Sequence, residues 1–152
     1  MSEQQSKPEK SARNRHDIPW REVLVQMDQN GKKGWSEDGY GVLPEEEKIA
    51  VSFSKLAGQV NNGGFHQFFS NGYGFYLPDL KKFSRQLDME GLADLLEEVE
   101  DRLDEVCVQA ENTSPKQPYH QAQLDDLDER FYEKWSDRVE ERLNHFFRDR
   151  SQ

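Results

Sequence analysis

Residues 89–110 read MEGLADLLEEVEDRLDEVCVQA, and their spacing is typical of a long amphipathic α-helix. Apolar side chains recur in steps of three and four, which places them on one face of a helix with 3.6 residues per turn. The residues that follow this spacing are Leu92, Leu95, Leu96, Val99, Leu103 and Val106. The pattern predicts a helix whose apolar stripe packs into a core.

The face opposite this apolar stripe is strongly acidic. Between Asp88 and Asn112 there are ten Asp and Glu residues and a single base, Arg102. Each pair of like charges four residues apart destabilises a helix by about 0.2–0.5 kcal/mol, so helix stability alone does not favour this pattern. We predict a partner-binding acidic ridge formed by Glu90, Asp94, Glu97, Glu98, Asp101, Asp104 and Glu105.

Two interpretations of this ridge stay open from the sequence. Acids three to four residues apart rise about 4.5–6 Å along a helix, which approximates the charge and coarse spacing of a phosphate backbone. A basic DNA-binding surface could accept such a row. The alternative is a solvated acidic face that keeps the protein soluble.

The rest of the chain also favours helices, and no segment alternates as a strand does. Apolar periodicity and helix-start prolines predict further helices over about 19–27, 44–60, 65–70, 78–87 and 122–148. Residues 30–43 hold several Asn and Gly residues and are predicted to form a loop. We therefore expect an all-α fold: a flexible tail over 1–16, then a single compact multi-helix domain over 17–150 with two long C-terminal amphipathic helices.

The last predicted helix has an unusual apolar spacing. Its apolar residues recur strictly every four positions, and such a row advances by about 40° per step around an ideal helix. These residues are Leu127, Phe131, Trp135, Val139, Leu143 and Phe147. We expect the helix to bend, or its two ends to pack against different neighbours, a second subunit among them.

Composition excludes several classes of protein. The chain has 152 residues, 30 acids and 20 bases, for a net charge of −10. This acidic balance argues against direct binding to nucleic acid and favours a basic partner. No apolar run is long enough for a membrane span, and residues 1–16 lack the apolar middle of a secretion signal. Cys107 is the one cysteine, which favours a reducing, cytoplasmic location.

No catalytic or metal-binding pattern stands out. The four histidines do not form a metal-ligand pattern, and the glycine-rich loops lack the residues of a phosphate cradle. Glu141, His145 and Asp149 are four apart and are typical of a solvated helix face. We predict a protein that is not an enzyme and that uses no metal or cofactor.

Residues 59–72 read QVNNGGFHQFFSNG and form the least random stretch of the chain. The glycines allow positive φ, the amides can bond the freed groups of helix ends, and the phenylalanines can anchor a corner in the core. The pattern predicts a structural corner built from Asn61, Asn62, Gly63, Gly64, Phe65, Gln67, Phe68, Phe69, Asn71 and Gly72.

This stretch resembles the signature of a bacterial family of DMP-nineteen-like domains of unknown function, which includes a DNA mimic protein. In that signature a helix leads into Asn-Gly-Gly-Phe, followed by Gln, two aromatic residues and Asn-Gly. The resemblance covers about residues 44–143 in the order of elements. It implies a small, acidic, all-helical protein that forms a dimer. For the DNA-mimic member it implies occupation of the DNA-binding surface of a transcription factor, which relieves repression.

Three functional hypotheses follow. The first is a DNA mimic that binds a DNA-binding protein through the acidic ridge, so that charge reversal at Glu97 and Asp101 abolishes binding. The second is an immunity-type inhibitor that uses the same acids against a basic toxin such as a nuclease. The third is a small-ligand-binding or enzymatic domain. Its site would be the polar corner of Asn61, Asn62, His66, Gln67 and Asn71.

Overall fold

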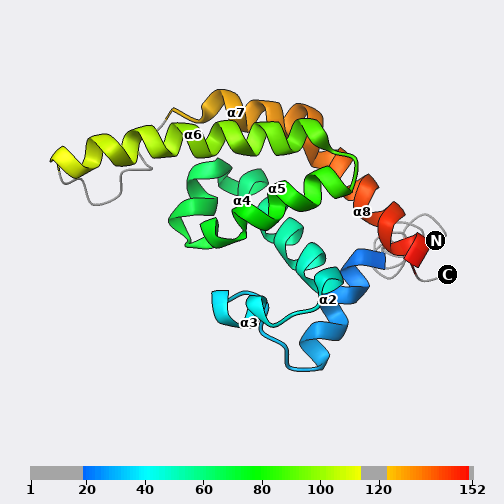
Figure 1. The fold of residues 1–152 in the computed structure, drawn as a ribbon. Helices are drawn as coiled ribbons and strands as arrows, with labels where there is room; N and C mark the ends of the chain where they lie inside the picture. The colour runs from blue at the N-terminus through cyan, green and yellow to red at the C-terminus, as the bar shows by residue number, and fades with distance from the viewer. Residues whose placement is uncertain (1–18, 114–122, 151–152) are drawn as a thin grey trace, which may run out of the picture. The chain divides into compact units, whose positions relative to one another are not determined.

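The computed structural model describes residues 19–113 and 123–150 of the chain (Figure 1). All regular structure in these ranges is helical, so the predicted all-α class is confirmed. The predicted tail over residues 1–16 lies outside the described residues. The chain divides into two compact units, Met1–Val51 with Leu143–Gln152, and Ser52–Arg142.

The first unit contains the short helices near the start of the chain. Helix α2, Pro19–Gln29, begins at the predicted proline and buries Trp20 and Met27. The prediction of a loop over residues 30–43 is wrong in part, because Glu37–Gly41 form the five-residue helix α3. The side chain of Ser36 accepts a hydrogen bond from Gly39 N at 3.1 Å and so caps this helix.

Helix α4, Glu45–Ser70, consists of two helical segments joined by a kink. Gly63 and Gly64 have non-helical backbone angles, and Gly64 has a φ of +79°. The first segment therefore ends at the two glycines, as predicted. The second segment carries Phe65 and Phe68, which are both fully buried.

The second unit continues with a 3₁₀ turn, Tyr73–Tyr76, and the predicted helix α5, Leu77–Gln86. The long acidic helix α6 covers Glu90–Thr113. Its predicted apolar stripe is buried from Leu92 to Leu103. Figure 1 shows α5 and α7, Asp125–Arg130, beside α6. None of the helices in the described ranges is both long and apolar enough to cross a membrane.

The last helical segment is interrupted near its start. Helix α7, Asp125–Arg130, leads into a π-helical segment, Phe131–Trp135, and then into α8, Ser136–Arg150. A π-helical turn holds more residues than an α-helical turn, so it counteracts the rotation that four-residue steps accumulate. The predicted apolar row is buried along its whole length, with its first four residues in the unit Ser52–Arg142 and its last two in the unit that contains Met1–Val51, so its two ends have different neighbours, as one of the two expectations stated. All six of its residues are buried: Leu127, Phe131, Trp135, Val139, Leu143 and Phe147.

Candidate functional site

The seven residues of the predicted acidic ridge all lie on α6 and reach the surface. Glu98 is half-buried and the other six residues are exposed. At 3.6 residues per turn, the acids of this helix occupy one arc of its surface, bounded by Glu100 on one edge and Glu98 on the other. The carboxylates on this arc differ in whether a base from another helix pairs with them.

One edge of the acidic arc is neutralised by α5. The ammonium of Lys81 lies 2.5 Å from a carboxylate oxygen of Glu100 and 3.6 Å from one of Glu97. The guanidinium of Arg85 lies 3.1 Å from Glu90 and 3.6 Å from Glu97. The hydrogen bond to Glu100 is the main cause that raises the pKa of Lys81 above its ordinary value. Two predicted ridge residues, Glu90 and Glu97, are therefore ion-pair partners of α5.

The other edge is neutralised by two arginines. Arg102 and Arg130 each donate to one oxygen of the Glu98 carboxylate, at 2.8 and 2.6 Å. Arg102 also donates to Asp126 at 2.6 Å and to the backbone carbonyl of Gln123 at 2.6 Å. The hydrogen bond from Arg130 is the main cause that lowers the pKa of Glu98. This edge thus connects α6 to α7 and is structural as well as acidic.

This pairing makes the stability of the protein depend on pH through Glu98. Because its pKa is lower in the folded than in the unfolded chain, its stabilisation is present above the ordinary glutamate pKa. It is lost as the pH falls through the folded-state pKa. Glu98→Gln is expected to lower the free energy of unfolding at pH 7 by at most about 1 kcal/mol, since the pair is partly solvated. Urea unfolding at pH 7 and at pH 3 measures this, and the loss should be smaller at pH 3 than at pH 7.

Glu105→Gln is the matched control for this prediction. Glu105 is exposed on the same helix, and no base among the described side chains pairs with it. Its substitution should cost no stability at either pH. An equal loss for the two variants at pH 7, or a loss for Glu98→Gln that is undiminished at pH 3, would contradict the assignment.

Four acids in the arc have no ion-pair partner among the described side chains. We call them the open carboxylates: Asp94, Asp101, Asp104 and Glu105. They occupy positions between the two paired edges and are all exposed. The sequence predicted a uniform ridge, whereas in the structure only these four of its seven members have no ion-pair partner among the described side chains.

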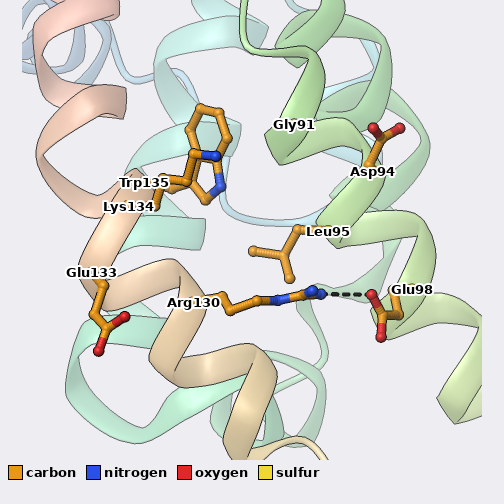
Figure 2. A pocket seen from close by; sticks show the side chains of 8 residues that line it. All are labelled: Gly91, Asp94, Leu95, Glu98, Arg130, Glu133, Lys134 and Trp135. Carbon is orange, nitrogen blue, oxygen red and sulfur yellow. Dashed lines mark hydrogen bonds and ion pairs between the residues drawn. The ribbon is translucent and has the colours of Figure 1, made fainter.

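A cleft of about 280 Å³ lies beside the paired edge, between α6 and the π-helical segment (Figure 2). Leu95 and Trp135 give it an apolar floor, and Figure 2 shows Arg130 reaching across to Glu98. A Cβ atom at Gly91 would lie 2.7 Å from the indole ring of Trp135, so a glycine is needed for this close packing. The residues that line the cleft are Gly91, Asp94, Leu95, Glu98, Arg130, Glu133, Lys134 and Trp135.

The Asn-Gly-Gly-Phe motif forms the kink of α4, and the carboxylate of a residue on another helix accepts a hydrogen bond from it. The backbone N–H of Phe65 donates to Asp128 of α7 at 2.9 Å, so Asp128 caps the segment that follows the kink. A Cβ atom at Gly64 would collide with the same carboxylate. Burial raises the pKa of Asp128 above its ordinary value.

The amide side chains of the motif bond to one another. The side-chain oxygen of Gln59 accepts from Gln67 at 3.0 Å and from Asn71 at 2.7 Å. Asn62 donates to the side-chain oxygen of Gln67 at 3.2 Å. Side-chain amides within residues 59–72 therefore hydrogen-bond to one another across the kink.

A second polar row, which was not predicted from the sequence, contacts this corner. Asp128, Tyr132 and Ser136 follow the buried apolar row at an offset of one residue, with the same four-residue spacing. Tyr132 donates to the carbonyl of Val60 at 2.9 Å, and Asn61 donates to the hydroxyl of Ser136 at 3.0 Å. Their spacing was visible in the sequence, but their partners lie more than 60 residues away.

No group of three or more His, Cys, Asp or Glu side chains is placed to hold a metal ion in the part of the chain that the structure describes. His145 lies 3.3 Å from Asp149, one turn later on α8.

The sequence model of the DMP19-like protein family matches residues 42–150 of the chain. Neither a search of curated proteins nor a search of solved structures gave a match. The matched range contains the kinked helix α4, the acidic helix α6 and the last helical segment, and it covers well over half of the chain. The chain therefore belongs to the family of DMP19-like proteins.

Proposed function

We propose that this protein is a DNA mimic. It binds the basic DNA-binding surface of a transcription factor or another DNA-binding protein through α6 and blocks the binding of DNA. The observation that carries this proposal is the set of four open carboxylates on one helix whose two acidic edges are already paired. Membership of the DMP19-like family is consistent with it.

The arrangement suits recognition of a basic surface. Asp94 and Asp101 are seven residues apart, which corresponds to about 10 Å along the helix. Asp104 and Glu105 continue the same charged surface over the next turn. Because ion pairs on both edges fix α6 against its neighbours, the open carboxylates are presented on a rigid element. A partner rich in Lys and Arg then gains charge complementarity with little ordering of the acidic surface.

The polar corner offers less support for an enzyme or a small-ligand site. The amides of Asn62, Gln67 and Asn71 are engaged with neighbours inside the motif. The cleft described above is lined by other residues. We therefore propose a binding protein without catalytic activity.

The proposed function is tested by reversing open carboxylates. In Asp101→Lys/Asp104→Lys, two acids of the open set become bases, and affinity for the partner should fall at least about tenfold, or about 1.4 kcal/mol. Glu97 is a poor choice for this test, because a lysine there would face Lys81 and Arg85. The measurement is capture from source-cell lysate by the tagged full chain at low salt, with salt-step elution and mass spectrometry.

A matched variant controls for net charge. Glu22→Lys/Asp28→Lys changes the total charge equally at two exposed positions of α2. A DNA-binding protein that wild type and the α2 variant capture, and that the α6 variant loses, supports mimicry. The purified partner should then be released from its DNA by wild type. Equal capture by both variants would contradict the proposal, and capture of a basic toxin would favour the immunity-type alternative.

A further inference from the structure

Helix α7 runs antiparallel to α6 beside it (Figure 1), and charged residues of the last helical segment meet charged residues of α6 at four-residue steps. Arg102 of α6 pairs with Asp126 at 2.6 Å. One four-residue step further along the contact between the two helices, Glu98 pairs with Arg130 at 2.6 Å. At the next step Asp94 and Lys134 both line the cleft. No ion pair joins them in the described part of the structure. Two of these steps are therefore closed by an ion pair, and the third, at Asp94 and Lys134, is open because it has none.

The two closed steps differ in how firmly they are held. Arg102 is 28% exposed and donates to Gln123, Asp126 and Glu98. Arg130 is 51% exposed, and its one hydrogen bond to a described residue goes to Glu98. Replacing Arg102 disrupts several contacts at once, whereas Arg130 can leave Glu98 at the cost of a single solvent-exposed pair.

The cleft gives an incoming side chain access to this pair. The indole of Trp135 packs closely against Gly91 at one end of the cleft, and Figure 2 shows Arg130 crossing the other end to Glu98. Lys134 lies on the same helical segment as Arg130. While Arg130 stays in place, Arg130 and Lys134 both repel a cation of a partner. Such a cation can pair with the Glu98 carboxylate only when Arg130 moves aside.

We propose that Arg130 is a displaceable internal ligand of Glu98. In the free protein it occupies the place that an arginine side chain of the basic partner takes in the complex, where Asp94 lies one helical turn away. This inference rests on the proposed function, in which α6 faces a basic partner. Guanidinium suits the position because it pairs with carboxylates in a fixed planar geometry. The internal ion pair then competes with the partner for Glu98 and so lowers the affinity for the partner.

The test compares two arginine substitutions of equal charge. Arg130→Gln removes one of the two arginines that pair with Glu98 and frees the oxygen that Arg130 holds, whereas Arg138→Gln removes an exposed arginine whose ion pair is with Glu141 at 3.4 Å. Binding of a fluorescent nona-arginine peptide to the full chain is measured by anisotropy at low salt. Arg130→Gln should bind about two- to fivefold more tightly than Arg138→Gln, the range expected for freeing an exposed ion pair.

A Glu98→Gln background decides whether the effect passes through Glu98. In that background the two arginine variants should bind the peptide equally. Equal binding in the wild-type background, or a difference that survives Glu98→Gln, would overturn the inference. The Asp101→Lys/Asp104→Lys and Glu22→Lys/Asp28→Lys variants are measured with the same peptide. Equal binding by these two variants contradicts the proposed function, whereas equality of the arginine variants alone contradicts only the inference about Arg130.

Discussion

Gly64→Ala is expected to lower the free energy of unfolding by about 3 kcal/mol. A φ of +79° at this position is strained for any residue with a Cβ, at a cost of about 1–3 kcal/mol. The new Cβ also displaces the Asp128 carboxylate that caps the second segment of α4, and a lost cap costs about 0.5–2 kcal/mol. Urea unfolding followed by circular dichroism measures the change.

Gly58→Ala is the matched control on the same helix. Gly58 lies within the first segment of α4, and a Cβ there would meet no neighbouring atom within 4 Å. Because alanine favours a helix over glycine, this variant should be more stable by about 0.5–1 kcal/mol. A destabilisation of Gly64→Ala no larger than about 1 kcal/mol would show that neither backbone strain nor the Asp128 cap matters at the kink.

Phe131→Ala is expected to have the second large effect, a loss of about 3–5 kcal/mol of stability. Phe131 is fully buried in the π-helical segment, and its ring packs edge-to-face on Phe65 with 6.0 Å between ring centroids. Its truncation leaves a cavity at the point where the last helical segment meets the Asn-Gly-Gly-Phe corner. Thermal and urea unfolding of the full chain measure the loss.

Tyr132→Phe separates this packing effect from the polar contacts beside it. The substitution keeps the ring of Tyr132, which is 40% exposed, and removes only the hydrogen bond to the carbonyl of Val60. A loss of about 1 kcal/mol is expected. If Phe131→Ala cost no more than Tyr132→Phe, the aromatic contact between the corner and the last helical segment would not be a main source of stability.

Local patterns predicted most of the helices correctly. Proline and glycine set the starts of α2 and α5 and the kink of α4, since these residues act through their own backbone geometry. The exception in the first unit was α3, where five residues among glycines form a helix because Ser36 caps them. A helix this short has too few residues for apolar periodicity to reveal it.

The last helical segment shows where periodicity is ambiguous. Its strict four-residue apolar row predicted a bend or a change of neighbours. In the structure the row is buried, its two ends belong to different compact units, and a π-helical segment is inserted at Phe131–Trp135. The sequence contained the deviation from α-helical spacing. Packing decided how the backbone accommodated it, because burying Phe131 and Trp135 favours a wider turn.

By itself the sequence determined the all-helical class, the buried stripe of α6 and the concentration of acids on its other face, because these depend on spacing along one helix. Only the tertiary structure decided which of those acids are open. Lys81, Arg85 and Arg130 come from other helices and pair with acids of the arc, which leaves only the open carboxylates without an ion pair among the described side chains. The cap that Asp128 provides for Phe65 joins residues 63 positions apart. Such contacts depend on how helices pack, and helix packing is not encoded in the periodicity of any single helix.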